Sequence, residues 1–164
     1  MGKRYFRQVR KHFQFLVDEH GFSVEREVDG GRYLMVVFQQ TDSAHPNICR
    51  IRIPYQEGRV QVDVAPISAA EDWFGLATII QYLMPEAEER WTYDGVYDPK
   101  PGKQLENLAA EVRERLGAIL QLFEGRTFAQ GRPGLVACRK RRAAEGLARI
   151  DAGWQARVKV EEQK

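Results

Sequence analysis

Cysteine and histidine are both scarce in this chain. The two cysteines, Cys49 and Cys138, lie far apart, whereas a small secreted domain uses more cysteines at patterned spacings. We therefore expect a protein of the reducing cytoplasm. The three histidines, His12, His20 and His45, never fall at the spacing of a zinc-binding pair, and no Cys-x-x-Cys motif is present. The sequence accordingly predicts no metal site.

Long apolar runs are also missing from the sequence. The longest uninterrupted run, residues 33–38, is far shorter than the roughly 20 residues of a membrane-spanning helix. The first residues lack the apolar region of a signal peptide, and Phe6 stands where N-myristoylation requires Ser or Thr. These features favour a soluble, cytoplasmic protein with no membrane partner.

Familiar catalytic motifs are lacking as well. No Gly-x-Ser-x-Gly sequence is present, and Ser68 is better explained as a helix cap. The segment 131–134 has neither the length nor the lysine of a phosphate-binding loop. Cys138 precedes a basic run that can activate a thiol, but the sequence specifies no general base for it. We expect no catalytic residue and no cofactor, which favours a non-enzymatic protein and leaves an uncatalogued hydrolase as the least favoured class.

What the chain does have is the composition of an ordinary globular domain. Its 164 residues are 43% hydrophobic and 29% charged. A chain of this length can bury about 70% of its unfolded surface, which suffices for a core without disulfides or metals. We expect one domain with an appended helix.

Hydrophobic periodicity predicts a helix and then four strands in the first half. Apolar residues at three- and four-residue steps indicate a helix over residues 4–20, which Gly21 is placed to end. Alternating residues predict four strands, at 22–29, 32–39, 48–55 and 59–65. Gly30-Gly31 and the segment 56–58 supply hairpin turns. Pro54 cannot donate a ladder hydrogen bond, so we expect the third strand to end there or to lie at an edge.

The second half is predicted to be helical. Ser68 begins a capping box that opens a helix, and Pro85 ends or kinks that helix. Residues 90–102 have the composition of a loop, and residues 103–124 form the clearest amphipathic helix. A last amphipathic stretch extends over residues 135–160.

This order of elements predicts the α+β class. An N-terminal helix precedes a four-stranded antiparallel meander, and three helices follow, including a long basic C-terminal helix. We place residues 1–125 in the α+β domain and residues 126–164 in a basic helical extension that packs on the domain or on a second copy.

The strand pattern places charged residues on one solvent-facing side of the sheet. These residues are Glu25, Glu27, Arg50, Arg52, Gln61 and Asp63. Cross-strand ion pairing is the interpretation we favour, because opposite charges on neighbouring strands stabilise a sheet. Arg50, Arg52 and Asp63 are nevertheless our candidate interaction residues on the sheet.

Charge is distributed unevenly along the chain. Residues 1–125 contain 15 Lys and Arg against 19 Asp and Glu, whereas residues 126–164 contain 10 against 4, giving net charges of −4 and +6. Candidate interaction residues in the basic segment are Arg139, Lys140, Arg141, Arg142, Arg149 and Arg157. An apolar stripe also follows this segment, at Leu147, Ile150, Trp154 and Val158. We expect the stripe to pack on the body or on a second copy, and nucleic-acid binding is the alternative.

Several of these segments together resemble a known type of protein. The segments 15–22 and 58–65, Trp73 and the helix 105–122 are similar to a pattern in small, uncharacterised prokaryotic α+β proteins. Some proteins of that type are regarded as immunity proteins that neutralise a partner toxin. The resemblance implies a non-enzymatic module that binds another protein. The alternative is a nucleic-acid-binding accessory protein that uses its basic C-terminal helix.

Overall fold

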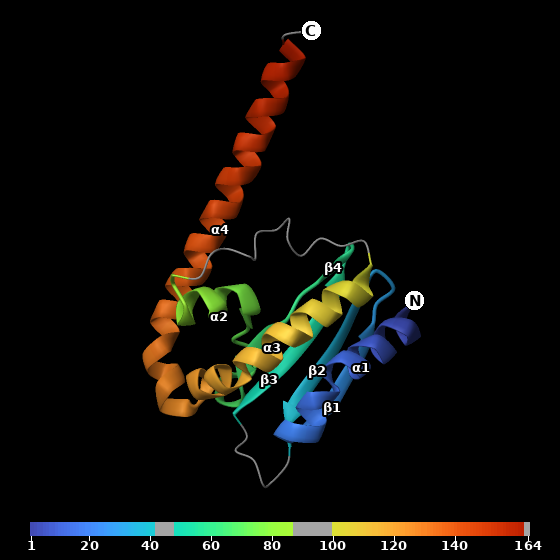
Figure 1. Ribbon diagram of the computed structural model, residues 1–164. Coiled ribbons are helices and arrows are strands. Elements are labelled where there is room, and N and C mark those ends of the chain that lie inside the picture. The colour runs from blue at the N-terminus through green and yellow to red at the C-terminus, as the bar shows by residue number, and fades with distance from the viewer. Residues whose placement is uncertain (42–47, 87–99, 163–164) are drawn as a thin grey trace.

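The protein has an α+β fold, and its described residues form an N-terminal helix, an antiparallel sheet and three later α-helices (Figure 1). The computed structural model describes residues 1–41, 48–86 and 100–162; for residues 149–151 and 153–162 it describes the backbone alone. The elements are α1 (Gly2–His20), β1 (Phe22–Asp29), β2 (Tyr33–Gln40), β3 (Cys49–Gln56), β4 (Arg59–Val60), β5 (Asp63–Pro66), the 3₁₀ helix η1 (Ile67–Ala69), β6 (Phe74–Gly75), α2 (Leu76–Leu83), α3 (Pro101–Phe123) and α4 (Gly125–Glu162). None of the described helices is both long and apolar enough to cross a membrane.

The boundary between α1 and β1 is set by a glycine. Gly21 adopts the left-handed conformation with φ 70°, and its N–H donates to the carbonyl of Leu16. A residue without a Cβ reaches this conformation at no steric cost, so it ends the helix. Phe22 follows at once and is buried as the first residue of β1. The predicted end of the first helix is therefore confirmed.

Among the described residues, the sheet has six strands rather than the four predicted. Its order is β1-β2-β3-β5-β6, and β4 pairs with β3 beside β5. The predicted fourth strand is divided because it faces Pro54. The N–H of Gln61 donates to the Pro54 carbonyl at 3.0 Å, but proline has no N–H with which to return the bond. The prediction for Pro54 itself is wrong, since β3 continues through it to Gln56 in the middle of the sheet.

The prediction of a helix that begins at Ser68 is also wrong. Residues 67–69 form only a short 3₁₀ turn, and Phe74 then pairs with Val64 on β5, so α2 begins at Leu76. Phe74 is fully buried, with its ring centroid 6.3 Å from that of Phe123. Burying this aromatic ring in the core outweighs the local signals for a helix.

Helices α1 and α3 cover the same face of the sheet (Figure 1). The core lies between these helices and the sheet. It contains the apolar face of each helix and the inward residues of the strands, including Ile51 and Ile53 on β3 and Leu116 on α3. Helix α4 begins ten residues before the predicted position, because its first turns contribute Phe128 and Leu135 to this core. Helix α4 contacts the body as far as Arg142, and its C-terminal part projects away from the body (Figure 1).

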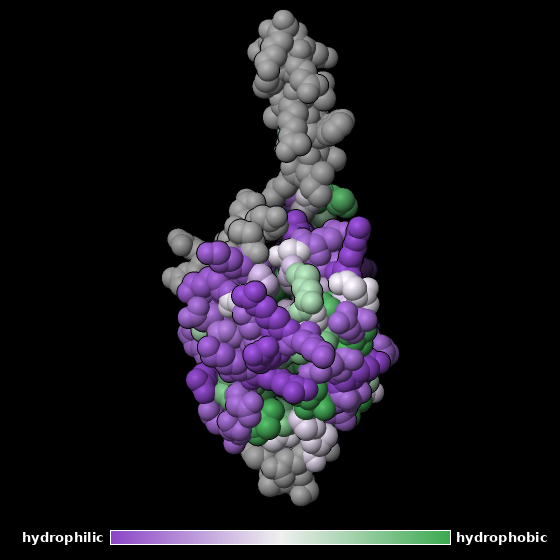
Figure 2. Space-filling view, turned by 90° about the vertical axis from the view of Figure 1, so that its right-hand side faces the viewer, coloured by the Kyte–Doolittle hydropathy of each residue, from purple (hydrophilic) through white to green (hydrophobic). Residues whose placement is uncertain are grey.

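Strand β1 forms one edge of the sheet. Figure 2 shows the side of the molecule on which α1 and β1 lie, and hydrophilic residues dominate it. A β-bulge interrupts the pairing between Val24 and Arg26, within the charged part of this edge strand. Bulges and charges oppose the addition of further strands to an open edge. The predicted loop at 90–102 lies mostly outside the described residues.

Candidate interaction surface

The three sheet residues predicted as candidates lie on one face. Ile51 and Ile53 point into the core, so Arg50 and Arg52, which alternate with them on β3, lie on the face opposite α1 and α3. Arg52 pairs in register with Asp63 on β5, and its Nε donates to the Asp63 carboxylate at 2.7 Å. The structure therefore brings Arg50, Arg52 and Asp63 together on what we call the outer face of the sheet.

Arg50 forms its ion pair with a more distant strand. Its Nε and Nη2 donate to the Glu25 carboxylate at 3.0 and 2.8 Å. The bulge in β1 separates Glu25 from Glu27, although strand alternation predicts both on the same face. Glu27 instead pairs with Arg10 of α1 at 2.8 Å. The prediction for Glu27 is therefore wrong, because an inserted residue breaks the alternation on which it rested.

Trp73 joins the two arginines. The guanidinium carbon of Arg52 lies 4.5 Å from the centre of the indole ring, and that of Arg50 lies 5.4 Å away. Each cation thus has an aromatic ring and a carboxylate as neighbours, which is a favourable arrangement for arginine. We call this group the Trp73 cluster; its members are Glu25, Arg50, Arg52, Asp63 and Trp73.

The segment containing Trp73 also contacts α4. Arg132 pairs with Asp72 at 2.6 Å, and Nη1 of Arg139 donates to the Trp73 carbonyl at 3.1 Å. The Arg139 guanidinium also lies 4.7 Å from the ring centre of Phe74. Two sets of candidates that are far apart in sequence therefore meet at residues 72–74.

The other basic candidates of α4 are placed differently. Arg142 donates to the side-chain oxygen of Gln81 at 3.4 Å, while Lys140 and Arg141 are exposed. Arg141 also lies 3.5 Å from the sulfur of Cys138. Arg149 and Arg157 belong to the helix, but their side chains lie outside the described part of the structure.

A polar depression of about 630 Å³ adjoins the Trp73 cluster. Its lining shares Arg52 and Asp63 with the cluster and adds side chains from β2 and from the β3–β4 hairpin. These additional residues are Tyr33, Pro54, Gln56, Glu57, Arg59 and Gln61. Together the cluster and the depression form a concave, mixed-charge surface on the outer face of the sheet.

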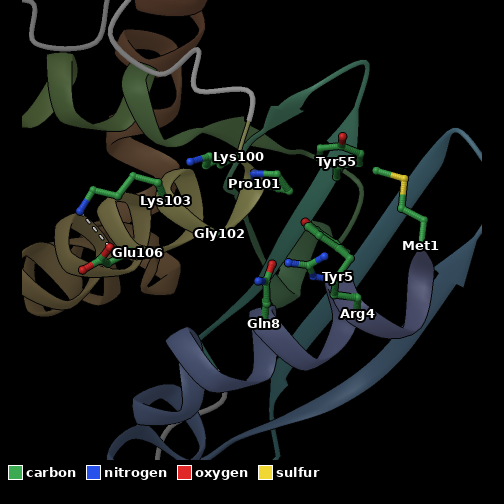
Figure 3. Close-up of a pocket in the computed structure, with 10 residues that line it drawn as sticks. All are labelled: Met1, Arg4, Tyr5, Gln8, Tyr55, Lys100, Pro101, Gly102, Lys103 and Glu106. Carbon is green, nitrogen blue, oxygen red and sulfur yellow. Dashed lines mark hydrogen bonds and ion pairs between the residues drawn. The ribbon is translucent and has the colours of Figure 1, made fainter.

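A second cavity, of about 570 Å³, lies between the first turns of α1 and α3 (Figure 3). Tyr5 lines it, but its hydroxyl donates to the Ile53 carbonyl at 2.9 Å. Burial raises the pKa of Tyr5 well above its ordinary value, so this phenol stays protonated and is a poor general base. Lys103 at the rim forms an ion pair with Glu106 at 2.9 Å. These engaged groups supply no nucleophile with an adjacent base.

The described cysteines have the environment of structural residues. Burial raises the pKa of the Cys49 thiol to about 12, so the reactive thiolate is almost absent at neutral pH. Cys138 is buried in α4. Within the described residues, no group of three His, Cys, Asp or Glu side chains is arranged to hold a metal ion.

Comparison of the chain with protein-family models, with curated proteins and with solved structures found no match in any of the three. The functional argument therefore depends on the surface itself. Sequence reasoning found Arg50, Arg52 and Asp63 but assigned Trp73 to a helix. The sequence Asp-Trp directly before the buried Phe74 was the available signal for a turn that presents the indole.

Proposed function

We propose that this protein is a non-enzymatic protein-binding module whose partner docks on the Trp73 cluster and the adjoining depression. The observation that supports this most strongly is the stacking of Arg52 on Trp73 beside a concave surface. Trp, Tyr and Arg are the residue types that contribute most to binding energy at protein interfaces. Tyr33 adds the third type to the same surface.

The charges of this surface favour a protein over a nucleic acid. Arg50 and Arg52 already have carboxylate partners in Glu25 and Asp63. A phosphate backbone needs unneutralised cations, and its affinity increases with the number of counterions that those cations release. A partner of mixed polarity, by contrast, benefits from arginine and tryptophan side chains that are already held in position.

The resemblance of the sequence to immunity-type proteins supports a specific class of partner. A protein that neutralises a toxin needs a fixed, complementary surface and no chemistry of its own. We therefore propose a toxin-type protein in a prokaryotic cytoplasm as the partner. The nucleic-acid alternative depends on the basic residues of α4, which are Arg139, Lys140, Arg141, Arg142, Arg149 and Arg157.

Site-specific photo-crosslinking in the cells from which the protein comes tests this proposal. Gln61 is exposed in the depression, and Gln121 is exposed on α3, so the same benzophenone amino acid can replace either glutamine. We expect irradiation to join the Gln61-substituted protein to one discrete protein. The Gln121-substituted protein serves as the matched control and should give no such product.

Two results would overturn the proposal. One is crosslinking of equal yield from both positions, which would show that the outer face has no preference for a partner. The other is a product of the Gln61-substituted protein that nuclease digestion removes, which would support the nucleic-acid alternative.

A further inference from the structure

The segment that carries Trp73 has no regular structure of its own. Residues 70–73 lie between the 3₁₀ helix η1 and β6 and form neither a helix nor a strand. The backbone of such a segment is not held by a ladder of hydrogen bonds, so other parts of the chain must fix it. Arg50 supplies one contact, because its Nη1 donates to the Ala70 carbonyl at 3.2 Å. The position of the indole therefore depends on contacts from outside the segment.

Helix α4 contacts three consecutive residues at the end of this segment. Arg132 pairs with Asp72 at 2.6 Å, immediately before Trp73 in the chain. Arg139 donates to the carbonyl of Trp73 itself at 3.1 Å, and its guanidinium lies 4.7 Å from the ring centre of Phe74, the next residue. The main chain on both sides of the indole is thus held by one helix.

The spacing along α4 explains how one helix reaches these positions. Arg132 and Arg139 are seven residues apart, which is about two helical turns, so they lie on one side of α4. Leu135 lies between them in the sequence and on nearly the same side, and it is fully buried in the core. Because the core holds α4 at Leu135, both guanidinium groups extend toward residues 72–74 from a fixed helix.

From these contacts we infer that Arg139 is a positioning residue, which holds Trp73 in place for the partner of the outer face, with Arg132 as a second contact. This inference rests on the function proposed for that face. Arg50 and Arg52 contact the indole ring, whereas Arg139 fixes the main chain that carries it. A side chain that is already held in position loses less conformational entropy when a partner covers it, so binding is tighter.

The role of Arg139 in this arrangement differs from phosphate binding. Its guanidinium is engaged by the Trp73 carbonyl and the Phe74 ring, and a phosphate contact would compete with both. Lys140 is the next residue of the helix and is exposed, so it offers a cation for a matched control. Arg139→Met and Lys140→Met each remove one positive charge and keep an apolar stem.

Relaxation of ¹⁵N nuclei in the full chain measures how firmly the indole is held. The three tryptophans give three indole N–H signals, and Trp73→Phe identifies the signal of Trp73 by its loss. We expect an order parameter of about 0.85, comparable to that of rigid backbone, in the unchanged protein and in Lys140→Met. In Arg139→Met it should fall below about 0.6. An Arg139→Met variant with an unchanged order parameter would overturn the inference, even if its melting temperature falls.

The crosslink from position 61 tests the consequence for binding. When Arg139→Met is combined with the benzophenone amino acid at Gln61, the yield of the discrete product should fall about threefold or more at a fixed low level of expression. Lys140→Met should leave the yield unchanged. An undiminished yield with Arg139→Met would overturn the role in binding. If position 61 gives no discrete product at all, the proposed function fails, and the order parameter alone decides whether Arg139 positions the indole.

Discussion

Arg50 on β3 forms a bidentate ion pair with Glu25 on β1, although β2 lies between these two strands. Arg50 is 7% exposed, so its guanidinium lies flat across the sheet rather than extending into solvent. This ion pair connects the edge strand β1 to the central strand β3. It also holds Arg50 against Trp73, and so links the stability of the outer face to the geometry of the proposed binding surface.

Removing the Arg50 side chain should destabilise the fold measurably. Arg50→Met keeps the apolar stem but leaves the Glu25 carboxylate without its partner, and we expect a loss of about 1.5–3 kcal/mol in the free energy of unfolding. Urea denaturation measures this loss. Arg32→Met, at an exposed position in the β1–β2 turn, is the control and should change the free energy little. Equal effects of the two changes would contradict the role assigned to the pair.

The contact between α2 and α4 depends on Gly134 of α4. A Cβ at Gly134 would lie 2.5 Å from the ring of Tyr82, whereas a Cβ at Gly146 would meet no atom within 4 Å. Gly134→Ala should therefore cost about 1–3 kcal/mol through overpacking. Gly146→Ala, in the same helix, should instead stabilise by about 0.5–1 kcal/mol. Thermal unfolding of both variants checks these signs, and a stabilising Gly134→Ala would show that Tyr82 does not pack there.

The thiol of Cys49 should be inert in the folded protein. Because burial raises its pKa to about 12, little thiolate is present at neutral pH, and access is blocked as well. In a Cys138→Ser variant, Ellman's reagent should detect no thiol in the native protein and one thiol per chain in guanidinium. Rapid reaction in the native state would contradict the buried position of Cys49.

His12 should make the fold less stable in mild acid. Burial, together with the nearby Lys11, lowers the pKa of His12 below its ordinary value, although Glu106 partly opposes this. The unfolded chain then binds a proton more readily than the folded chain, so stability is complete above a pH of about 6.5 and falls below it. His12→Asn should reduce the fall in melting temperature between about pH 7 and pH 5. An identical fall in both proteins would show that His12 does not contribute.

Local signals in the sequence predicted the local features of the fold. Gly21 ends α1 as expected, and the hairpin at residues 56–58 forms with positive φ angles at Glu57 and Gly58. The predictions that proved wrong involve residues whose conformation depends on contacts with residues far away in the sequence. Phe74 leaves the predicted helix because the rings of Phe123 and Phe128 surround it.

The candidate site was predictable only in part for the same reason. Strand alternation was enough to place Arg50, Arg52 and Asp63 on one face. It was not enough to separate Glu25 from Glu27, because a bulge is specified by the register with β2 and not by the residues of β1 alone. Trp73 entered the site through the turn before β6, a strand of two residues that periodicity cannot detect.

Calorimetric titration with the protein that crosslinks to the depression tests the central claim most directly. Trp73→Ala should raise the dissociation constant at least about thirtyfold, as expected for a residue that contributes about 2 kcal/mol to binding. Gln61→Arg, which adds bulk at an exposed position of the depression, should weaken binding as well, and Gln121→Arg on α3 should not. Circular dichroism should show that all three variants remain folded. The same dissociation constant for the unchanged protein and all three variants would contradict binding at the outer face.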